Sequence, residues 1–206
     1  RMKQRLMAIV AEGPRGRVYL SPTPAQEAIA TKAKPSWLPE NKLPDNPRDF
    51  KTPNYGMNKF GDLFTSRQLV ALTTFSDLVD DARKMIRRDA ITAGLSDDCI
   101  PLETGGTGAS AYADAVSLYL GLGIDRQANR SSSICFWDTK GENVQQVFAR
   151  QAIPMTWDFT ESNPLGFSTG NFIGQIDGLS KVIQQCLPAL KSSTALQCDA
   201  QRQKIS

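Results

Sequence analysis

The chain has 206 residues, of which 40% are hydrophobic and 22% are charged, and its formal net charge is +3. This composition is typical of a globular protein of about one good-sized domain, and the small positive charge permits nucleic-acid binding without indicating it. Histidine is absent, which excludes Ser-His and Cys-His nucleophile pairs and histidine-based metal sites.

The sequence also lacks the usual signals of membranes and of zinc. No apolar run approaches the ~20 residues that a transmembrane helix needs, and the first residues lack the apolar stretch of a signal peptide, so we expect a cytoplasmic protein without membrane contact. The four cysteines contain no C-x-x-C pair, so we expect no metal site. The chain begins at Arg1 rather than methionine, and we expect it to be part of a longer protein.

The first quarter of the chain predicts two strands, a short helix and an extended segment. Residues 5–20 surround a Gly-Pro-Arg-Gly turn and look like a strand pair. Residues 24–30 predict a helix with Thr23 as its N-cap. Residues 34–55 carry five prolines, and because proline cannot donate ladder hydrogen bonds we expect an extended loop over a surface. Two aromatic side chains are expected to attach this loop to the core: Trp37 and Phe50.

From residue 66 onward the pattern is mainly helical. Residues 66–93 place apolar side chains at steps of three and four, with Thr65 or Ser66 as the cap and Gly94 as the stop. A second helix follows the glycines at 105–108, and a third is expected over about 171–187. The expected inward stripe of the second helix consists of Tyr112, Ala115, Val116, Tyr119, Leu120 and Ile124.

The predicted fold class is therefore mainly α with short β elements, an α+β fragment. A short strand is expected at 133–138, a helical turn near 142–149, and a strand in the last residues of the chain. We divide the chain into a strand pair with its proline-rich segment (1–55), a helical domain (56–190) and a final strand (191–206).

The stretch ETGGTGASAYADAV at 103–116 contains a match to G-x-G-x-x-A, a pattern of dinucleotide-binding turns. That fingerprint needs a buried strand before it and an acid at the end of a second strand. Here the preceding DDCIPLET is broken by proline, and Asp125 falls within a predicted helix. We interpret the stretch as a helix start capped by Thr104 or Thr107. An anion at that helix N-terminus stays open.

A second candidate is the corner formed by WDFTE and the asparagine that follows. Paired acids can do acid–base work or bind cations, but a structural corner with a packed indole and capping carboxylates is the alternative. Asn163 begins Asn-Pro-Leu-Gly, which matches the amine-holding motif of amino-methyltransferases at two of four positions and more often forms a turn. The residues of this functional corner are Trp157, Asp158, Glu161 and Asn163.

A third candidate is a run of four cations on one and a half helical turns: Arg83, Lys84, Arg87 and Arg88. Such a run can contact nucleic-acid phosphates. The alternative is a solvated helix face balanced by neighbouring acids, namely Asp80, Asp81 and Asp89. Both interpretations stay open at this point.

Three long blocks together resemble one known family: YGMNKFGDLFTSRQLVALTTFSDLV (55–79), GGTGASAYADAVSLYLGLGIDRQANRSSSICFWD (105–138) and FARQAIPMTWDFTESNPLG (148–166). They are similar to consecutive blocks of the large adenine-specific DNA methylases that contain a Zn-ribbon, which occur in prokaryotic modification and phage-defence settings. The resemblance covers most of residues 8–200, in order and with similar spacing.

The resemblance implies a position within a larger enzyme. Members of the family carry a Phe-Ala-Gly-Gly-Gly cofactor motif and a Zn-ribbon before a segment like this one, and a catalytic Asp-Pro-Pro-Tyr motif after it. This sequence has none of the three, so it looks like the internal region between the cofactor-binding motif and the catalytic motif. Asp199 is similar to the acid that contacts the adenine ring of S-adenosylmethionine, and 191–206 to the start of a methyltransferase-core strand.

The resemblance thus implies a helical region inserted in or adjacent to a Rossmann-like domain of an S-adenosylmethionine-dependent DNA adenine-N6 methyltransferase. We expect an internal scaffold or DNA-contacting region that is inactive alone, with no catalytic residue of its own. Its partners would be DNA, through the four cations, and the rest of the parent chain. The alternative is a non-catalytic module that binds DNA or a partner protein of a phage-defence system. A third hypothesis is a structural insert, recognisable by exposed apolar surface or dimerisation.

Overall fold

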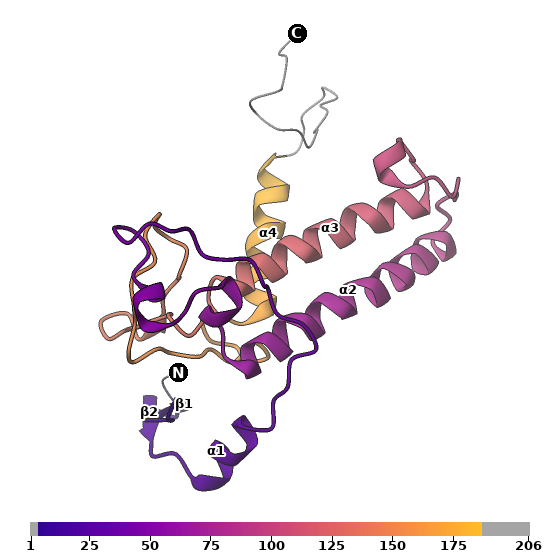
Figure 1. Ribbon diagram of the computed structural model, residues 1–206. Helices are drawn as coiled ribbons and strands as arrows, with labels where there is room; N and C mark the ends of the chain where they lie inside the picture. The colour runs from indigo at the N-terminus through magenta and orange to yellow at the C-terminus, as the bar shows by residue number, and fades with distance from the viewer. Residues whose placement is uncertain (1–3, 187–206) are drawn as a thin grey trace.

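The structure, a computed structural model, describes residues 4–186 (Figure 1). Within this range the helices are α1 (Pro24–Ala30), α2 (Ser66–Thr92), α3 (Ala109–Ala128) and α4 (Phe172–Cys186), and short 3-10 turns span Thr52–Tyr55, Phe60–Leu63 and Leu102–Thr104. Two antiparallel sheets pair β1 (Ile9–Gly13) with β2 (Gly16–Leu20), and β3 (Trp137–Asp138) with β4 (Asn143–Val144). A mainly helical fold with short β elements is therefore confirmed, and no Rossmann-like sheet lies within residues 4–186.

The N-terminal strand pair and helix form as their sequence predicts. The strands pair from Ile9 opposite Leu20 to Gly13 opposite Gly16, which leaves a two-residue turn between the glycines. Helix α1 begins with a capping box: the Thr23 hydroxyl accepts from the Gln26 amide, and the Gln26 side chain accepts from the Thr23 amide at 2.8 Å. In Figure 1 this unit lies apart from the long helices, and an extended segment connects the two.

Helices α2 and α3 form a helix hairpin, and α4 packs against both of them. The Thr65 hydroxyl accepts from the Gln68 amide at 3.1 Å, and α2 ends before Gly94, whose φ is +95°. The seven residues of the stripe predicted for α2 are all buried or half-buried. The ring of Phe172 in α4 stacks on Phe75 of α2, with the ring centroids 4.4 Å apart.

The largest apolar cluster lies beside the base of the hairpin and is built mainly by irregular segments. Its buried members are Leu43, Leu63, Ile134, Cys135, Val144, Val147 and Ile153. Phe50 packs against this cluster as expected, whereas the same expectation for Trp37 is wrong, because its side chain is 61% exposed. The proline-rich segment is held instead by buried Leu43, whose amide donates to the Asn58 carbonyl at 2.9 Å.

One backbone carbonyl connects the start of α2 to the segment that follows α3. The Leu63 carbonyl accepts three hydrogen bonds, from the Ser132 hydroxyl (2.7 Å), the Ser133 hydroxyl (2.9 Å) and the Ser133 amide (2.8 Å). The Leu63 side chain is itself fully buried, and both serines are buried. Polar groups in such a place are costly unless they are paired. This cluster of hydrogen bonds therefore fixes where α2 begins relative to the end of α3.

Helix α3 turns a different face inward from the one its sequence predicts. The side chains of Tyr112 and Tyr119 are 53% and 42% exposed, which corrects the expected inward stripe. The buried positions carry small side chains and one glutamine: Ala109, Ala111, Ala113, Gly123 and Gln127. Small side chains let α2 and α4 approach the α3 backbone closely, which a tyrosine at the same place would prevent.

The segment near 142–149 also differs from its prediction. Residues Asn143–Val144 form strand β4 and pair with β3, so the helical turn expected there is wrong. The pairing is continued by the Gln145 amide, which donates to the Phe136 carbonyl at 3.0 Å. The apolar spacing that favours a helical turn is satisfied here by a short strand pair whose Val144 enters the core.

The two glycines inside α3 give a matched pair for testing this packing. A Cβ at Gly121 meets nothing within 4 Å, whereas a Cβ at Gly123 collides with Ile176 Cδ1 of α4. Because glycine is a poor helix residue, Gly121→Ala should raise the free energy of unfolding by about 0.5–1 kcal/mol. Gly123→Ala should lose this gain and lower the stability. Chemical denaturation of both variants measures the difference, and equal stabilisation by both would contradict the observed contact of α4 with α3.

Candidate functional site

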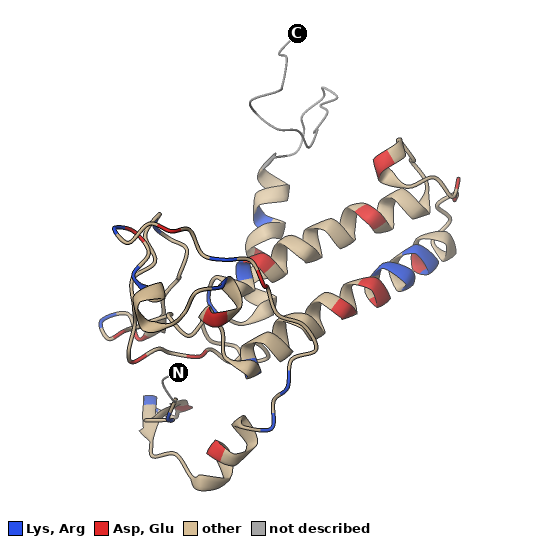
Figure 2. Ribbon diagram, viewed as in Figure 1, with Lys and Arg blue, Asp and Glu red and all other residues tan. Residues whose placement is uncertain are grey.

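The four cations of α2 lie on the C-terminal half of that helix, where Figure 2 shows the basic side chains close together. Each of the four has a carboxylate partner in the structure. Arg83 and Arg87 reach across to Asp114 of α3 and to Asp97 of the connecting loop, both at 2.6 Å. Lys84 pairs with Asp81 at 2.9 Å and Arg88 with Asp89 at 3.0 Å on α2 itself.

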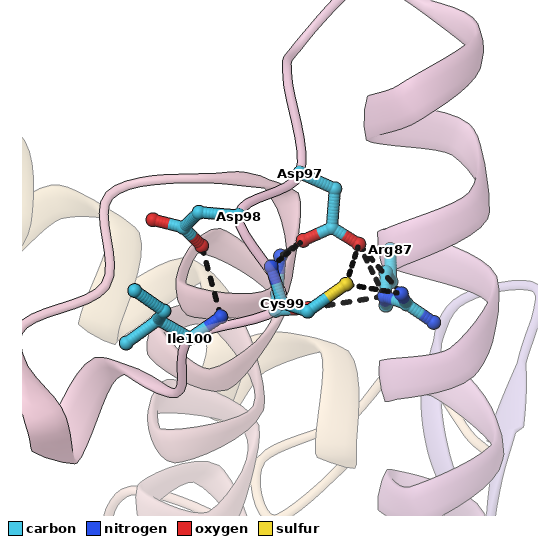
Figure 3. A network of polar contacts seen from close by, with 6 residues as sticks. Arg87, Asp97, Asp98, Cys99 and Ile100 are labelled. Atoms are coloured by element: carbon cyan, nitrogen blue, oxygen red, sulfur yellow. Dashed lines mark hydrogen bonds and ion pairs between the residues drawn. The ribbon is translucent and has the colours of Figure 1, made fainter.

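The Arg87 contact belongs to a network that also starts helix α3 (Figure 3). The Arg87 guanidinium donates to Asp97 Oδ2 and, at 3.0 Å, to the Ser110 hydroxyl. Asp97 Oδ1 accepts from the backbone amides of Cys99 and Ser110, both at 3.1 Å. One carboxylate thereby connects α2, the loop and the first turn of α3.

The glycine stretch before α3 is filled by the chain's own groups. Asp98 Oδ2 accepts from the Thr107 amide at 3.0 Å, and the amides of Gly106 and Ala109 donate to the carbonyls of Pro101 and Ser96. A Cβ at Gly106 would collide with the Ile100 carbonyl oxygen, so the loop needs a glycine there. The interpretation as a helix start is confirmed, but the caps are Asp97 and Asp98 rather than Thr104 or Thr107.

The anion at this helix N-terminus is therefore a pair of aspartates. The pKa of Asp97 lies well below its ordinary value because the Ser110 hydroxyl, the Arg87 guanidinium and two backbone amides all favour its charged form. The pKa of Asp98 is lowered by the backbone amides of Thr107 and Ile100. Negative charge near a helix N-terminus also interacts favourably with the helix dipole. These carboxylates occupy the amides that a nucleotide phosphate would need.

A shallow hollow of about 430 Å³ lies between the basic side of α2 and the start of α3. Its lining combines the four cations with small and apolar side chains: Ile91, Thr92, Ser110 and Ala113. The cations match in number the carboxylates that pair with them, so the wall of the hollow carries no large net charge. A phosphate that binds here has to displace a carboxylate from Lys84 or Arg88, whose side chains are 74% and 68% exposed.

The corner at 157–163 is irregular backbone rather than helix. Glu161 accepts two hydrogen bonds from the Arg67 guanidinium, at 2.9 and 3.0 Å, and a third from the Thr65 hydroxyl at 3.2 Å. It therefore supports the N-terminal cap of α2, as the structural alternative expects. Trp157, in contrast, is 64% exposed and makes an edge-to-face contact with Tyr55 at 5.1 Å.

The other site residues do not converge on this corner. Asp158 is exposed, and Asn163 Oδ1 accepts from the Leu165 amide at 3.0 Å, which closes a local turn. The candidate cofactor contact Asp199 lies outside the described residues. Glu161 and the basic run also contact different ends of α2, so the sequence-predicted residues form two separate sites rather than one.

Cysteine and acidic side chains do not gather into a metal site within residues 4–186. Cys135 is buried in the core, and burial raises the pKa of its thiol to about 11. Cys99 is exposed, which corrects for this residue the expectation that scattered thiols are buried. Its backbone φ of +55° is held by the turns that Asp97 and Asp98 form.

Comparisons with known proteins add no relative: no family model, no curated protein and no solved structure matches this chain. Among the described residues, no helix is both long and apolar enough to cross a membrane.

Sequence reasoning missed the residues that organise this end of the molecule, namely Asp97, Asp98 and Asp114. The Asp-Asp pair precedes a glycine turn and a helix, which is a capping signal at a distance of about ten residues. Cap searches consider the position directly before the helix, so they overlook a loop that folds back. Asp114 was hidden within a helix whose orientation was predicted incorrectly.

Replacing Asp97 by asparagine tests the network at the start of α3. Asp97→Asn keeps an oxygen for the two backbone amides but removes the charge that pairs with Arg87, so we expect a lower Tm at pH 7. Because the folded pKa lies below the ordinary value of 3.8, this stabilisation is present above about pH 4 and is lost as the pH falls through the folded pKa. The Tm difference between the parent chain and the variant should therefore shrink in acid.

Circular dichroism melts from pH 7 to pH 3 provide the measurement. Asp81→Asn is the matched control, because Asp81 pairs with Lys84 on an exposed surface and should contribute little. A Tm difference for Asp97→Asn that stays constant with pH would refute the charge-based role.

Proposed function

We propose that this chain is an internal, non-catalytic scaffold region of an S-adenosylmethionine-dependent DNA adenine-N6 methyltransferase, inserted in or adjacent to its Rossmann-like domain. The family resemblance of the three sequence blocks suggests the enzyme class. The observation that carries the scaffold role is the large apolar surface that the described residues leave exposed. Large apolar side chains on this surface outnumber the apolar residues of the core.

The exposed side chains are concentrated in part on the segment that leads into α4. Trp157, Leu165 and Ile173 are 64%, 79% and 67% exposed, and Phe167 is fully exposed. Covering a side chain of this size is worth about 1.5–3 kcal/mol. Monomeric proteins rarely leave extensive apolar surface uncovered without a use for it. The rest of a larger protein is the occupant that this proposal assigns to the segment.

The chemistry of the proposed enzyme explains why a scaffold is useful. The exocyclic amine of adenine is a weak nucleophile because its lone pair is delocalised into the ring. An acidic motif and a backbone carbonyl have to accept its hydrogens, and the base has to leave the DNA stack to reach them. Much of the rate then comes from positioning for in-line attack on the methyl group. In this proposal the catalytic groups come from the rest of the parent chain, and Asp199 is a contact to the cofactor adenine.

Phe167→Ser tests the scaffold role. In the complete parent protein the substitution should lower the free energy of unfolding by about 1.5–3 kcal/mol, because the ring would lose a covered site. In the 206-residue chain the same substitution should change the stability by less than about 0.5 kcal/mol, since the ring is already exposed. Equal small effects in both proteins would contradict the scaffold role.

The enzyme class is tested separately with labelled S-adenosylmethionine and adenine-containing DNA. The parent protein should transfer the methyl group, and its reading frame should contain Asp-Pro-Pro-Tyr shortly after Ser206. The 206-residue chain should give no transfer above a control without protein. Transfer by the 206-residue chain would show that its placement between the cofactor and catalytic motifs is wrong.

A second candidate function, a module that binds DNA, is favoured by the cation-lined hollow beside α2. The exposed cations Lys84 and Arg88 would make the phosphate contacts. Lys84→Ala with Arg88→Ala should then weaken DNA binding and make its salt dependence shallower by about 0.9 per lost contact. Fluorescence anisotropy at several salt concentrations measures both. Lys181→Ala on α4 is the control for loss of charge alone, and unchanged affinity in the double variant would remove this candidate.

A further inference from the structure

An apolar stripe runs along the face of α3 that its sequence predicts to be buried. Tyr112, Ala115, Tyr119 and Leu122 follow one another at steps of three, four and three residues, which is the spacing of a coiled-coil seam. Tyr112, Tyr119 and Leu122 are 53%, 42% and 41% exposed, and Leu118 beside them is 60% exposed. We call these five residues the α3 stripe.

The two ends of the α3 stripe carry opposite charges. At the end near the connecting loop, Tyr112 lines a hollow of about 450 Å³ together with Asp89 and the apolar side chains of Ile86, Ala90, Ala93 and Leu95. At the other end Arg126 follows Leu122 by one helical turn, on the same face, and is exposed. Figure 1 shows that α4 crosses α3 only near this second end.

We infer that the α3 stripe is a self-association surface, on which α3 of a second copy of this chain packs in antiparallel orientation. A two-fold axis through the middle of the stripe brings the Asp89 end of each copy to the Arg126 end of the other. The contact between Asp89 and Arg126 then occurs twice, whereas a parallel arrangement brings like charges together. Two-fold interfaces require such a self-complementary surface, and the seam spacing supplies the apolar part.

The size of the stripe sets the strength of this contact. Its exposed side chains offer on the order of 400 Å² of mostly apolar surface. A stable interface buries about 800 Å² on each partner, so the walls of the adjoining hollow have to supply part of the remainder. We therefore expect a weak dimer, with a Kd on the order of 10–100 μM. This inference holds whether or not the chain belongs to a methyltransferase.

Sedimentation equilibrium of the 206-residue chain over about 1–500 μM tests the surface. The expected result is a reversible monomer–dimer equilibrium that Leu122→Glu weakens at least tenfold. Leu78→Glu is the matched control: Leu78 is an exposed leucine of α2 outside the stripe, and its replacement should leave the equilibrium unchanged. A chain that stays monomeric at every concentration overturns the inference, as does a dimer that Leu122→Glu does not affect.

A charge exchange tests the antiparallel orientation. Asp89→Arg alone and Arg126→Asp alone each bring like charges together twice, so either variant should dimerise several-fold more weakly than the parent chain. In an equimolar mixture of the two variants, every 89–126 contact between unlike chains joins opposite charges, and heterodimers should form with the affinity of the parent chain. The double variant should also regain that affinity. A mixture that dimerises no better than the single variants overturns the orientation.

Discussion

The three hydrogen bonds to the Leu63 carbonyl determine where the helices lie relative to the core. They join the residue before the α2 cap to the serines after α3, and Glu161 holds the same cap from a third segment. The apolar cluster beside them contains little regular structure, so its shape depends on polar contacts as much as on packing. Because buried donors are costly to leave unpaired, the loss of one serine hydroxyl disturbs more than a single contact.

The opposite end of the hairpin depends on charge rather than on packing. Asp97, Asp98 and Asp114 hold the loop, the start of α3 and two arginines of α2 together. This arrangement changes the meaning of two sequence motifs. The glycine stretch allows a loop to approach the helix, and half of the basic run consists of cross-links between helices. Only Lys84 and Arg88 keep the exposed position that a phosphate contact needs.

The sequence predicts those features that depend on neighbouring residues. The strand pair, α1 with its Thr23 cap and α2 with its Thr65 cap follow from local patterns, because their hydrogen bonds join residues a few positions apart. The inward face of α3 could not be predicted in this way, because both faces carry apolar residues and the close approach of α2 and α4 selects the small ones. Glu161 was recognised as a capping acid, but its contact with Arg67 spans 94 residues and needed the structure.

The two ends of the molecule also differ in the length of chain that their contacts close. Asp97 meets the Ser110 amide across 13 residues, whereas Phe50 pairs with Ile153 across more than a hundred. The entropy of loop closure grows with the logarithm of loop length, so the second contact costs about 2 kcal/mol more than the first. The charged end of the hairpin can therefore close on its own. The apolar cluster can close only when four distant stretches of chain arrive together.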